Sequence, residues 1–398
     1  MTERRIRLMD LTKPELREQA TAWGQPAYRG DQLYRWLHAR LAANPAEMTD
    51  LPADLRRRLA EEAQIELLTP VAESRSRDGH TTKVLFRLHD GQLIETVLMR
   101  YERRNTVCIS SQAGCAMGCT FCATGQMGLQ RNLTPGEIVA QVYFFERFLR
   151  APEHRSSAAD HRSSSSARQS QITNVVVMGM GEPLANYHNL WRALRTLTDP
   201  EGFGMGARRI TVSTVGLVPG IDRFSQEDLQ INLAVSLHAP NDALRSRLVP
   251  INLRYPIAEL LAACRRYVER THRRITFEYA LMRGINDSVA LAEELAGLLQ
   301  GLLCHVNLIP LNPVSGSPYQ PSRRADAEAF LATLQRHGIP ATLRVRRGID
   351  INAGCGQLRA NVAQGRRIAL AAAEPAAASQ ALTQTAERSR PRENGGKQ

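Results

Sequence analysis

The sequence lacks any long hydrophobic run. No stretch of its 398 residues approaches the roughly 18 consecutive apolar residues that a membrane-spanning helix requires. Residues 1–5 lead into a mixed charged segment without the apolar core of a secretory signal. The sequence therefore excludes an integral membrane protein and predicts a cytoplasmic protein with no membrane partner.

Acidic residues and cysteines are also scarce. Asp and Glu number 39 against 51 Lys and Arg, which gives a net charge of +12. Such an excess favours a polyanionic partner such as nucleic acid, although basic proteins without one are common. The cysteines number seven, an odd count in a chain with no export signal. This count argues against a disulfide framework and for metal or redox chemistry in a reducing compartment.

Residues 1–68 show helical patterns and predict an accessory domain. Thr12 is the expected cap of a first helix, with Pro14 in its first turn. The next helix, residues 30–38, has apolar side chains on one face: Leu33, Trp36 and Leu37. Basic side chains are left for solvent or phosphate: Arg29, Arg35 and Arg40. Both an RNA-binding domain and an ordinary helical bundle fit this pattern.

A β-hairpin linker is predicted for residues 69–104. The apolar runs 84–88 and 93–98 flank Asp90-Gly91, which is a strong signal for a tight turn.

Residues 105–348 alternate strand-like and helical patterns. This alternation predicts right-handed crossovers and a parallel sheet, for which we expect a partial (β/α)6-type TIM barrel; a doubly wound sheet is the competitor. A polar insertion loop interrupts the domain at residues 151–171. A loop and helix around Cys355 follow at 349–370, and residues 371–398 have the composition of a disordered tail.

Three cysteines in the spacing C-x3-C-x2-C form the most informative segment: Cys115, Cys119 and Cys122. Thiolates so close in sequence must share one centre, and no fourth Cys or His follows nearby to complete a zinc tetrahedron. An iron–sulfur cube held by three thiolates leaves one iron open for a ligand. A structural zinc site is the alternative.

This spacing resembles the radical S-adenosylmethionine (SAM) superfamily. Further motifs resemble those of its rRNA adenine-C2 methyltransferase family, in the family's order. They are residues 108–112 (CISSQ), 123–125 (ATG), 179–184 (GMGEPL), 212–214 (VST), 236–239 (SLHA), 310–313 (PLNP) and 354–358 (GCGQL). The resemblance covers residues 10–365. Independently of it, the motifs fall at the carboxyl ends of predicted parallel strands, where barrel enzymes assemble their sites.

The resemblance implies one [4Fe–4S] cluster per chain and two SAM molecules per turnover. The three cysteines would bind the cluster. The residues implied to bind SAM are Gly181, Glu182, Ser213, Ser236, Leu237, His238 and Asn312. Taken without the family, Glu182 could belong to a surface turn, the two serines could cap helices, and Asn312 could shape a turn.

The resemblance also implies a catalytic sequence. Cys355 takes a methyl group from one SAM, and a radical generated from a second SAM removes hydrogen from that methyl. The resulting carbon radical adds to adenine C2, a base removes the ring proton, and Cys108 releases the product by forming a disulfide with Cys355. Glu95 is an anomalous carboxylate in the otherwise apolar strand 93–99, and it matches the family's base. Without that match, a solvent-facing strand residue fits the pattern equally well. Buried core thiols are the alternative for both cysteines.

The expected substrates are adenine C2 of 23S rRNA at the peptidyl-transferase centre and certain tRNAs. The enzyme would also need an electron donor such as flavodoxin or ferredoxin and a thiol reductant for the disulfide, and we expect a monomer. Two other functions stay open. They are methylation of adenine C8, as in a related resistance branch, and non-catalytic nucleic-acid binding by an iron–sulfur protein.

Overall fold

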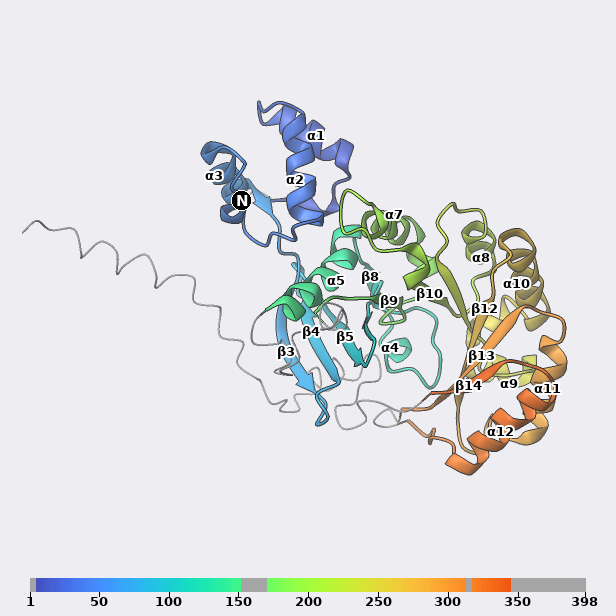
Figure 1. The fold of residues 1–398 in the computed structure, drawn as a ribbon. Helices are drawn as coiled ribbons and strands as arrows, with labels where there is room; N and C mark the ends of the chain where they lie inside the picture. The colour runs from blue at the N-terminus through green and yellow to red at the C-terminus, as the bar shows by residue number, and fades with distance from the viewer. Residues whose placement is uncertain (1–4, 152–169, 313–316, 345–398) are drawn as a thin grey trace, which may run out of the picture.

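The computed structural model describes residues 5–151, 170–312 and 317–344, and in this part the main sheet has ten strands (Figure 1). Parallel strands follow one another in chain order across the sheet. They are β6 (Arg104–Cys108), β9 (Asn174–Val177), β10 (Ile210–Thr214), β11 (Asn232–Ser236), β12 (Ile275–Leu281), β13 (Cys304–Pro310) and β14 (Ala341–Leu343). Antiparallel strands continue the sheet beyond β6: β5 (Leu93–Tyr101), β4 (Thr81–Arg87) and β3 (Thr69–Arg75).

Helices follow the parallel strands, as the alternation predicts. They are α5 (Pro135–Arg150), α7 (Tyr187–Thr198), α8 (Val218–Phe224), α9 (Asp242–Leu248), α10 (Ile257–Thr271), α11 (Val289–Leu299) and α12 (Arg324–Arg336). Short elements complete the body: β7 (Gln112–Gly114), β8 (Leu129–Asn132) and α4 (Ala123–Gln126). Among the helices the structure describes, none combines the length and apolar character needed to cross a membrane.

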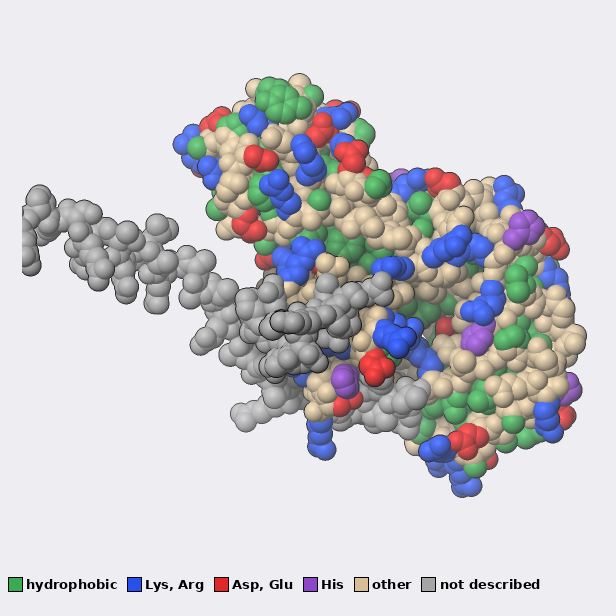
Figure 2. All heavy atoms as spheres, in the orientation of Figure 1, with side chains coloured by type: hydrophobic (Ala, Val, Ile, Leu, Met, Phe, Trp, Pro, Cys, Tyr) green, Lys and Arg blue, Asp and Glu red, His purple; other side chains and the backbone are tan. Residues whose placement is uncertain are grey.

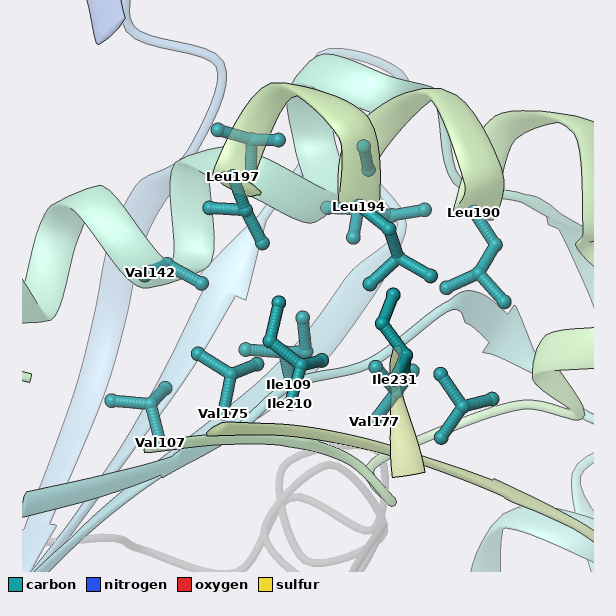
Figure 3. Packing of buried hydrophobic residues seen from close by; sticks show 14 of the residues in the cluster. Val107, Ile109, Val142, Val175, Val177, Leu190, Leu194, Leu197, Ile210 and Ile231 are labelled. Atoms are coloured by element: carbon teal, nitrogen blue, oxygen red, sulfur yellow. The ribbon is translucent and has the colours of Figure 1, made fainter. Parts of the chain in front are cut away.

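The two faces of the sheet have different neighbours. Figure 3 shows Val175 and Val177 of β9 pointing toward the apolar side chains of α5 and α7. Val176 lies between them in sequence, so it points to the opposite face, and there it lines a cavity. Helices on one face and a cavity on the other are typical of a barrel rather than of a doubly wound sheet, which confirms the predicted fold class.

The hairpin forms at the predicted turn. Gly91 adopts φ +82°, a conformation that glycine tolerates best, and its N–H bonds to the carbonyl of Leu88 at 2.9 Å. The resulting register places Leu85 opposite Glu95 and Lys83 opposite Val97. Because side chains alternate along each strand, these four share the face of the sheet that carries the cavity.

The N-terminal region contains α1 (Lys13–Ala22), α2 (Tyr28–His38) and α3 (Ala53–Glu62), with a two-stranded pairing of β1 (Ile6–Arg7) and β2 (Ala63–Gln64). Thr12 caps α1 as predicted, in a capping box with Glu15. In α2 the expected apolar face is buried.

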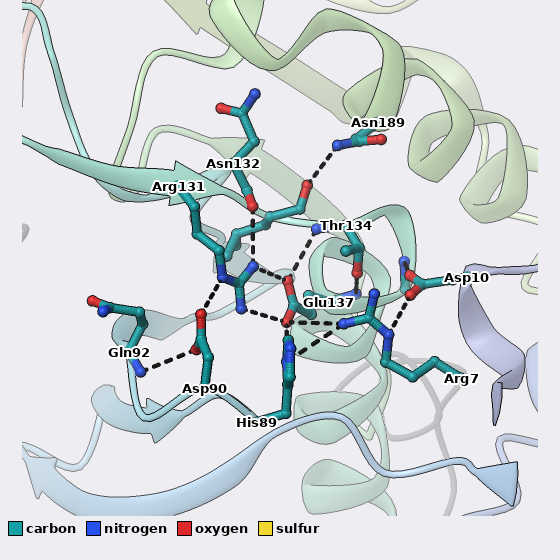
Figure 4. Close-up of polar contacts among 12 residues, drawn as sticks. Arg7, Asp10, His89, Asp90, Gln92, Arg131, Asn132, Thr134, Glu137 and Asn189 are labelled. Atoms are coloured by element: carbon teal, nitrogen blue, oxygen red, sulfur yellow. Dashed lines mark hydrogen bonds and ion pairs between the residues drawn. The ribbon is translucent and has the colours of Figure 1, made fainter. Parts of the chain in front are cut away.

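A polar cluster around Glu137 joins this region to the hairpin and to α5 (Figure 4). The carboxylate of Glu137 accepts hydrogen bonds from Arg131 at 2.8 and 2.9 Å and from the Thr134 N–H at 3.0 Å. Asp10 of the N-terminal segment accepts a bond from the Gly136 N–H at 2.9 Å. The N-terminal helices are therefore packed against the barrel and share its core.

Candidate active site

A cavity of about 420 Å³ lies at the carboxyl ends of the parallel strands and extends along the hairpin. Most of the predicted site residues line it: Glu95, Cys108, Cys115, Cys119, Cys122, Gly181, Glu182, Ser213, Ser236, His238 and Asn312. Cys355 lies outside the described residues. A wider hollow of about 830 Å³, beside residues 224–232 and 270–274, contains none of the predicted residues. The first cavity is therefore the candidate active site.

The three cysteines lie on the loop between β7 and α4. This loop is fastened through Thr120, whose N–H bonds to the carbonyl of Leu248 at 3.1 Å and whose hydroxyl lies 2.9 Å from that of Tyr319. Gly118 takes φ +65° within the loop, which a residue with a side chain adopts only under strain. The loop thus holds the cysteines against the segment that follows β11.

The donor set fits an iron–sulfur cluster. Burial raises the pKa of the Cys115 thiol to about 12, and burial with the neighbouring Cys122 and Cys115 raises that of Cys119 further. Such thiols become ligands only when a cation replaces their protons. Within the described residues, no three Cys, His, Asp or Glu side chains converge on a single ion position. In a cube each thiolate binds its own iron, so the three thiols of the C-x3-C-x2-C motif could each take one iron and leave the fourth open.

Glu182 connects two of the loops that rim the cavity. Its carboxylate accepts hydrogen bonds from the N–H of Leu184 at 3.0 Å and of Val215, after β10, at 2.9 Å. Gly181 precedes it at φ +104°, where an added Cβ would lie 2.6 Å from Gln112. Burial raises the pKa of Glu182 to about 7, so an ammonium group bound beside it would favour the ionised form. The reading of Glu182 as part of a surface turn is wrong, because its side chain is buried.

His238 is held as a neutral hydrogen-bond donor. Its Nδ1 accepts a bond from the Ala280 N–H at 3.0 Å, and burial lowers the pKa of the ring to about 3. The neutral ring therefore carries its proton on Nε2. The residue adopts φ +61°, and its carbonyl accepts a bond from Asn286 at 2.8 Å. Phe121 of the cysteine loop meets the ring edge-on at 4.9 Å.

The remaining predicted SAM residues occupy two kinds of position. Ser213 and Ser236 line the cavity at the ends of β10 and β11. Asn312 lines it too, and its Oδ1 is buried without a hydrogen-bond partner in the described structure. A buried acceptor of this kind suits a ligand that brings an N–H donor, such as the amino group of adenine. Leu237 points instead into the apolar core, and it is absent from the cavity lining.

The hairpin supplies the other wall of the cavity. Glu95 is buried, and its carboxylate oxygen Oε2 lies 2.8 Å from Nζ of Lys83. Glu95 is therefore no solvent-facing strand residue. Cys108 ends β6 opposite Val97, diagonally across from Glu95, and burial raises the pKa of its thiol to about 11.

Comparison with known proteins places the chain in a family. A family model of the ribosomal RNA large subunit methyltransferase N-terminal domain matches residues 6–65. A probable dual-specificity RNA methyltransferase RlmN from Roseiflexus sp. is 50% identical over 380 residues, which cover 88% of this chain and 95% of that relative. The dual-specificity RNA methyltransferase RlmN 1 of Myxococcus xanthus is 50% identical over 363 residues, 91% of this chain and 97% of the relative. This chain belongs to the RlmN family.

A solved relative agrees with this RlmN assignment. The crystal structure of a radical SAM methyltransferase from Sphaerobacter thermophilus shares 55% identity, covers 88% of this chain and 98% of its own, and superposes with a TM-score of 0.82. The predicted family and the radical SAM barrel are both confirmed, and the chain is an RNA methyltransferase by family.

Two basic residues near the cavity were not predicted from the sequence. One is Lys83, the partner of Glu95. The other is Arg245 of α9, which is fully buried. Its guanidinium donates hydrogen bonds to the carbonyls of Val215, Ser236 and Leu237 and to the side chain of Asn252. Arg245 thus holds together the loops that follow β10 and β11, beneath the predicted SAM residues.

Proposed function

We propose that this protein methylates C2 of adenine in 23S rRNA, at the peptidyl-transferase centre, and in tRNA, with one [4Fe–4S] cluster and two SAM molecules per turnover. The main support is the content of the cavity: three thiols, the predicted SAM residues other than Leu237, and the two candidate catalytic groups Glu95 and Cys108 all line it. The names of the relatives, dual-specificity RNA methyltransferases, support RNA as the substrate.

Cys115, Cys119 and Cys122 would hold the cluster and leave one iron for SAM. When bound, the cluster and SAM supply the methyl group and the radical chemistry that the protein directs. Such chemistry is needed because adenine C2 lies between two ring nitrogens and is electron-poor, as is a sulfonium methyl group. Two electrophiles do not combine by simple displacement.

The wall opposite the hairpin would orient SAM. The Glu182 carboxylate is placed to attract the SAM ammonium group, and the Nε2–H of His238 is a donor for its oxygens. The unpaired Oδ1 of Asn312 would accept from the adenine amino group. The two serines would contact the methionine or ribose part. Leu237, which points into the core, contributes through the packing beneath them.

The hairpin wall would act on the substrate base. Cys355 carries the methyl group and becomes joined to the base through it. Glu95 takes the ring proton at C2. The ring adduct would return its unpaired electron to the cluster held by the three cysteines. The Cys108 thiolate then attacks the Cys355 sulfur, and the bond from that sulfur to the product carbon breaks with its electron pair on the carbon. That carbon takes up a proton to complete the methyl group, and a thiol reductant reduces the resulting disulfide.

Binding of RNA is supported by the basic surface. Figure 2 shows Lys and Arg side chains over the N-terminal helices and the barrel, interleaved with acidic ones. Some of these Lys and Arg side chains would contact RNA phosphates, and the N-terminal helices would form an accessory RNA-binding domain. We further propose a cytoplasmic monomer that receives electrons from flavodoxin or ferredoxin.

Mass spectrometry of modified nucleosides tests the proposed function. We expect 2-methyladenosine to disappear from 23S rRNA and tRNA when the gene is deleted, and to return with the intact gene but not with Cys355→Ala. Loss of 8-methyladenosine instead would assign the protein to the C8 branch. Unchanged nucleosides in both RNAs would contradict the proposal.

A further inference from the structure

The ion pair of Lys83 and Glu95 is buried in the wall of the cavity. Nζ of Lys83 lies 2.8 Å from Oε2 of Glu95, and the two side chains are 0% and 1% exposed. The pair crosses the hairpin diagonally, from β4 to β5. Removing two charges from water opposes folding, and an apolar pair of similar volume is often as stable. A stability role alone therefore gives a weak account of this pair.

No other ion pair in the described part of the chain is enclosed to this degree. Each of the others has at least one side chain that is 20% or more exposed. Glu95 also lines the cavity, whereas Lys83 stands behind it on the same face of the hairpin. The lysine thus contacts the candidate base without lining the cavity itself.

If Glu95 is the base, its chemistry explains why the Lys83 ammonium group lies beside its carboxylate. A carboxyl group accepts a proton only when it is ionised. Burial without a counter-charge favours the protonated form, which has nothing to accept with. The Lys83 ammonium provides that counter-charge and fixes one carboxylate oxygen through a charge-assisted hydrogen bond.

We propose that Lys83 is a positioning residue that keeps Glu95 ionised and oriented for removal of the C2 proton. The proposal rests on the proposed function. In this step the C2–H bond breaks, its electron pair stays with the ring, and a new O–H bond forms on Glu95. Lys83 keeps its own proton throughout.

Other charged groups also act on this wall. Cys108 on β6 pairs with Val97 of β5, and the pKa of its thiol is raised by burial and by Glu95 and lowered by Arg344 and Lys83. Arg344, which follows β14, also lines the cavity. The pH profile of a Lys83 variant must therefore be compared with that of a control variant that keeps Lys83 together with Cys108 and Arg344.

Three substitutions test the proposal in the full-length, anaerobically reconstituted enzyme with an RNA fragment that contains the target adenosine. Lys83→Met removes the charge at similar length, and Lys83→Arg retains it. Thr96→Val is the matched control. Thr96 is buried on β5 next to Glu95 and points to the other face of the sheet, where its hydroxyl donates a hydrogen bond to Gln141 at 2.8 Å.

Three readouts separate the steps: the methylated Cys355 peptide, the covalent protein–RNA adduct on a denaturing gel, and the yield of 2-methyladenosine against pH. We expect Lys83→Met to methylate Cys355 normally but to retain the adduct. Its product formation at pH 7 should fall at least tenfold and recover as the pH rises, because a buried carboxyl group that lacks a counter-charge accepts a proton less readily at neutral pH than at high pH. Lys83→Arg should restore most of the neutral-pH rate, and Thr96→Val should keep the wild-type profile.

A double substitution keeps the test decisive if Lys83→Met alone folds poorly. In the Glu95→Gln background, Lys83→Met should reduce product no further, because a positioning residue acts through its partner. Additive losses, or a Lys83→Met profile that matches wild type, would overturn the proposal. A wild-type enzyme that neither methylates Cys355 nor forms 2-methyladenosine would instead contradict the proposed function.

Discussion

The two walls of the cavity are built differently. On the wall that we propose binds SAM, formed by Glu182, Ser213, Ser236, His238 and Asn312 and called the SAM wall below, polar side chains near strand ends are held by the main chain. Glu182 accepts hydrogen bonds from two N–H groups and His238 from one. On the hairpin wall, Glu95 is held by the side chain of Lys83 from another strand. Substitutions on the SAM wall should therefore act locally on cofactor binding. Those on the hairpin wall should act on later steps.

The largest effect is expected for the cluster. Cys119→Ala should abolish both the brown colour and turnover, because two thiolates cannot hold the cube in place. Iron and sulfide analysis with the visible spectrum of the anaerobically purified protein checks this. Stoichiometric zinc without iron in the wild-type protein would contradict the whole assignment.

Cys108→Ala should block the last step of the reaction, which is the release of the product from Cys355. We expect about 1–2 kcal/mol of lost stability, with Cys355 methylation intact and product release blocked. The variant should then be isolated cross-linked to RNA through Cys355, as peptide mass spectrometry after nuclease treatment would show. Normal turnover without an adduct would remove Cys108 from the mechanism.

The free energy of unfolding of the cofactor-free protein should depend on pH through Glu182 of the SAM wall. Burial raises the pKa of this carboxyl from 4.5 to about 7, so the protonated form stabilises the cofactor-free protein below pH 4.5. That contribution is lost as the pH rises through 7. Relative to Glu182→Gln, the wild type should lose on the order of 3 kcal/mol over this range in denaturant unfolding.

SAM affinity should show the opposite trend. Because the ammonium group of SAM favours the ionised carboxylate, binding to the wild type should tighten as the pH rises through 7. Equilibrium dialysis with Glu182→Gln should give a flatter curve. Parallel curves for the two proteins would show that Glu182 does not contact the ammonium group.

The smallest effect is expected far from both walls. Arg40 is exposed and lies over the Trp36 ring at 4.1 Å. Arg40→Gln should weaken RNA binding a few-fold and lower the salt dependence by about one counterion, if this arginine meets phosphate. Arg324→Gln, on α12, makes the same charge change at another exposed site. Equal effects from both would indicate non-specific attraction.

Much of this arrangement could be predicted from the sequence, because its signals are local. The turn at Asp90-Gly91, the alternation of strands and helices, and the cysteine spacing each depend on a few neighbouring residues. Lys83 was missed although a signal existed: counting both strands outward from the turn places it on the same face as Glu95.

Arg245 had no such signal. In sequence it resembles an exposed residue of a short helix, and its partners are mainly carbonyls of distant loops, which have no sequence signature. Leu237 shows the converse. It lies inside a SAM motif, but strand alternation directs its side chain into the core.

The fate of the methyl hydrogens tests the central claim most directly. The enzyme would be incubated with RNA and SAM that carries a fully deuterated methyl group, and the modified adenosine analysed by mass spectrometry. Transfer through Cys355 with hydrogen abstraction predicts 2-methyladenosine whose methyl group retains two of the three deuteriums. A methyl group that retains all three would show direct transfer and would contradict the account.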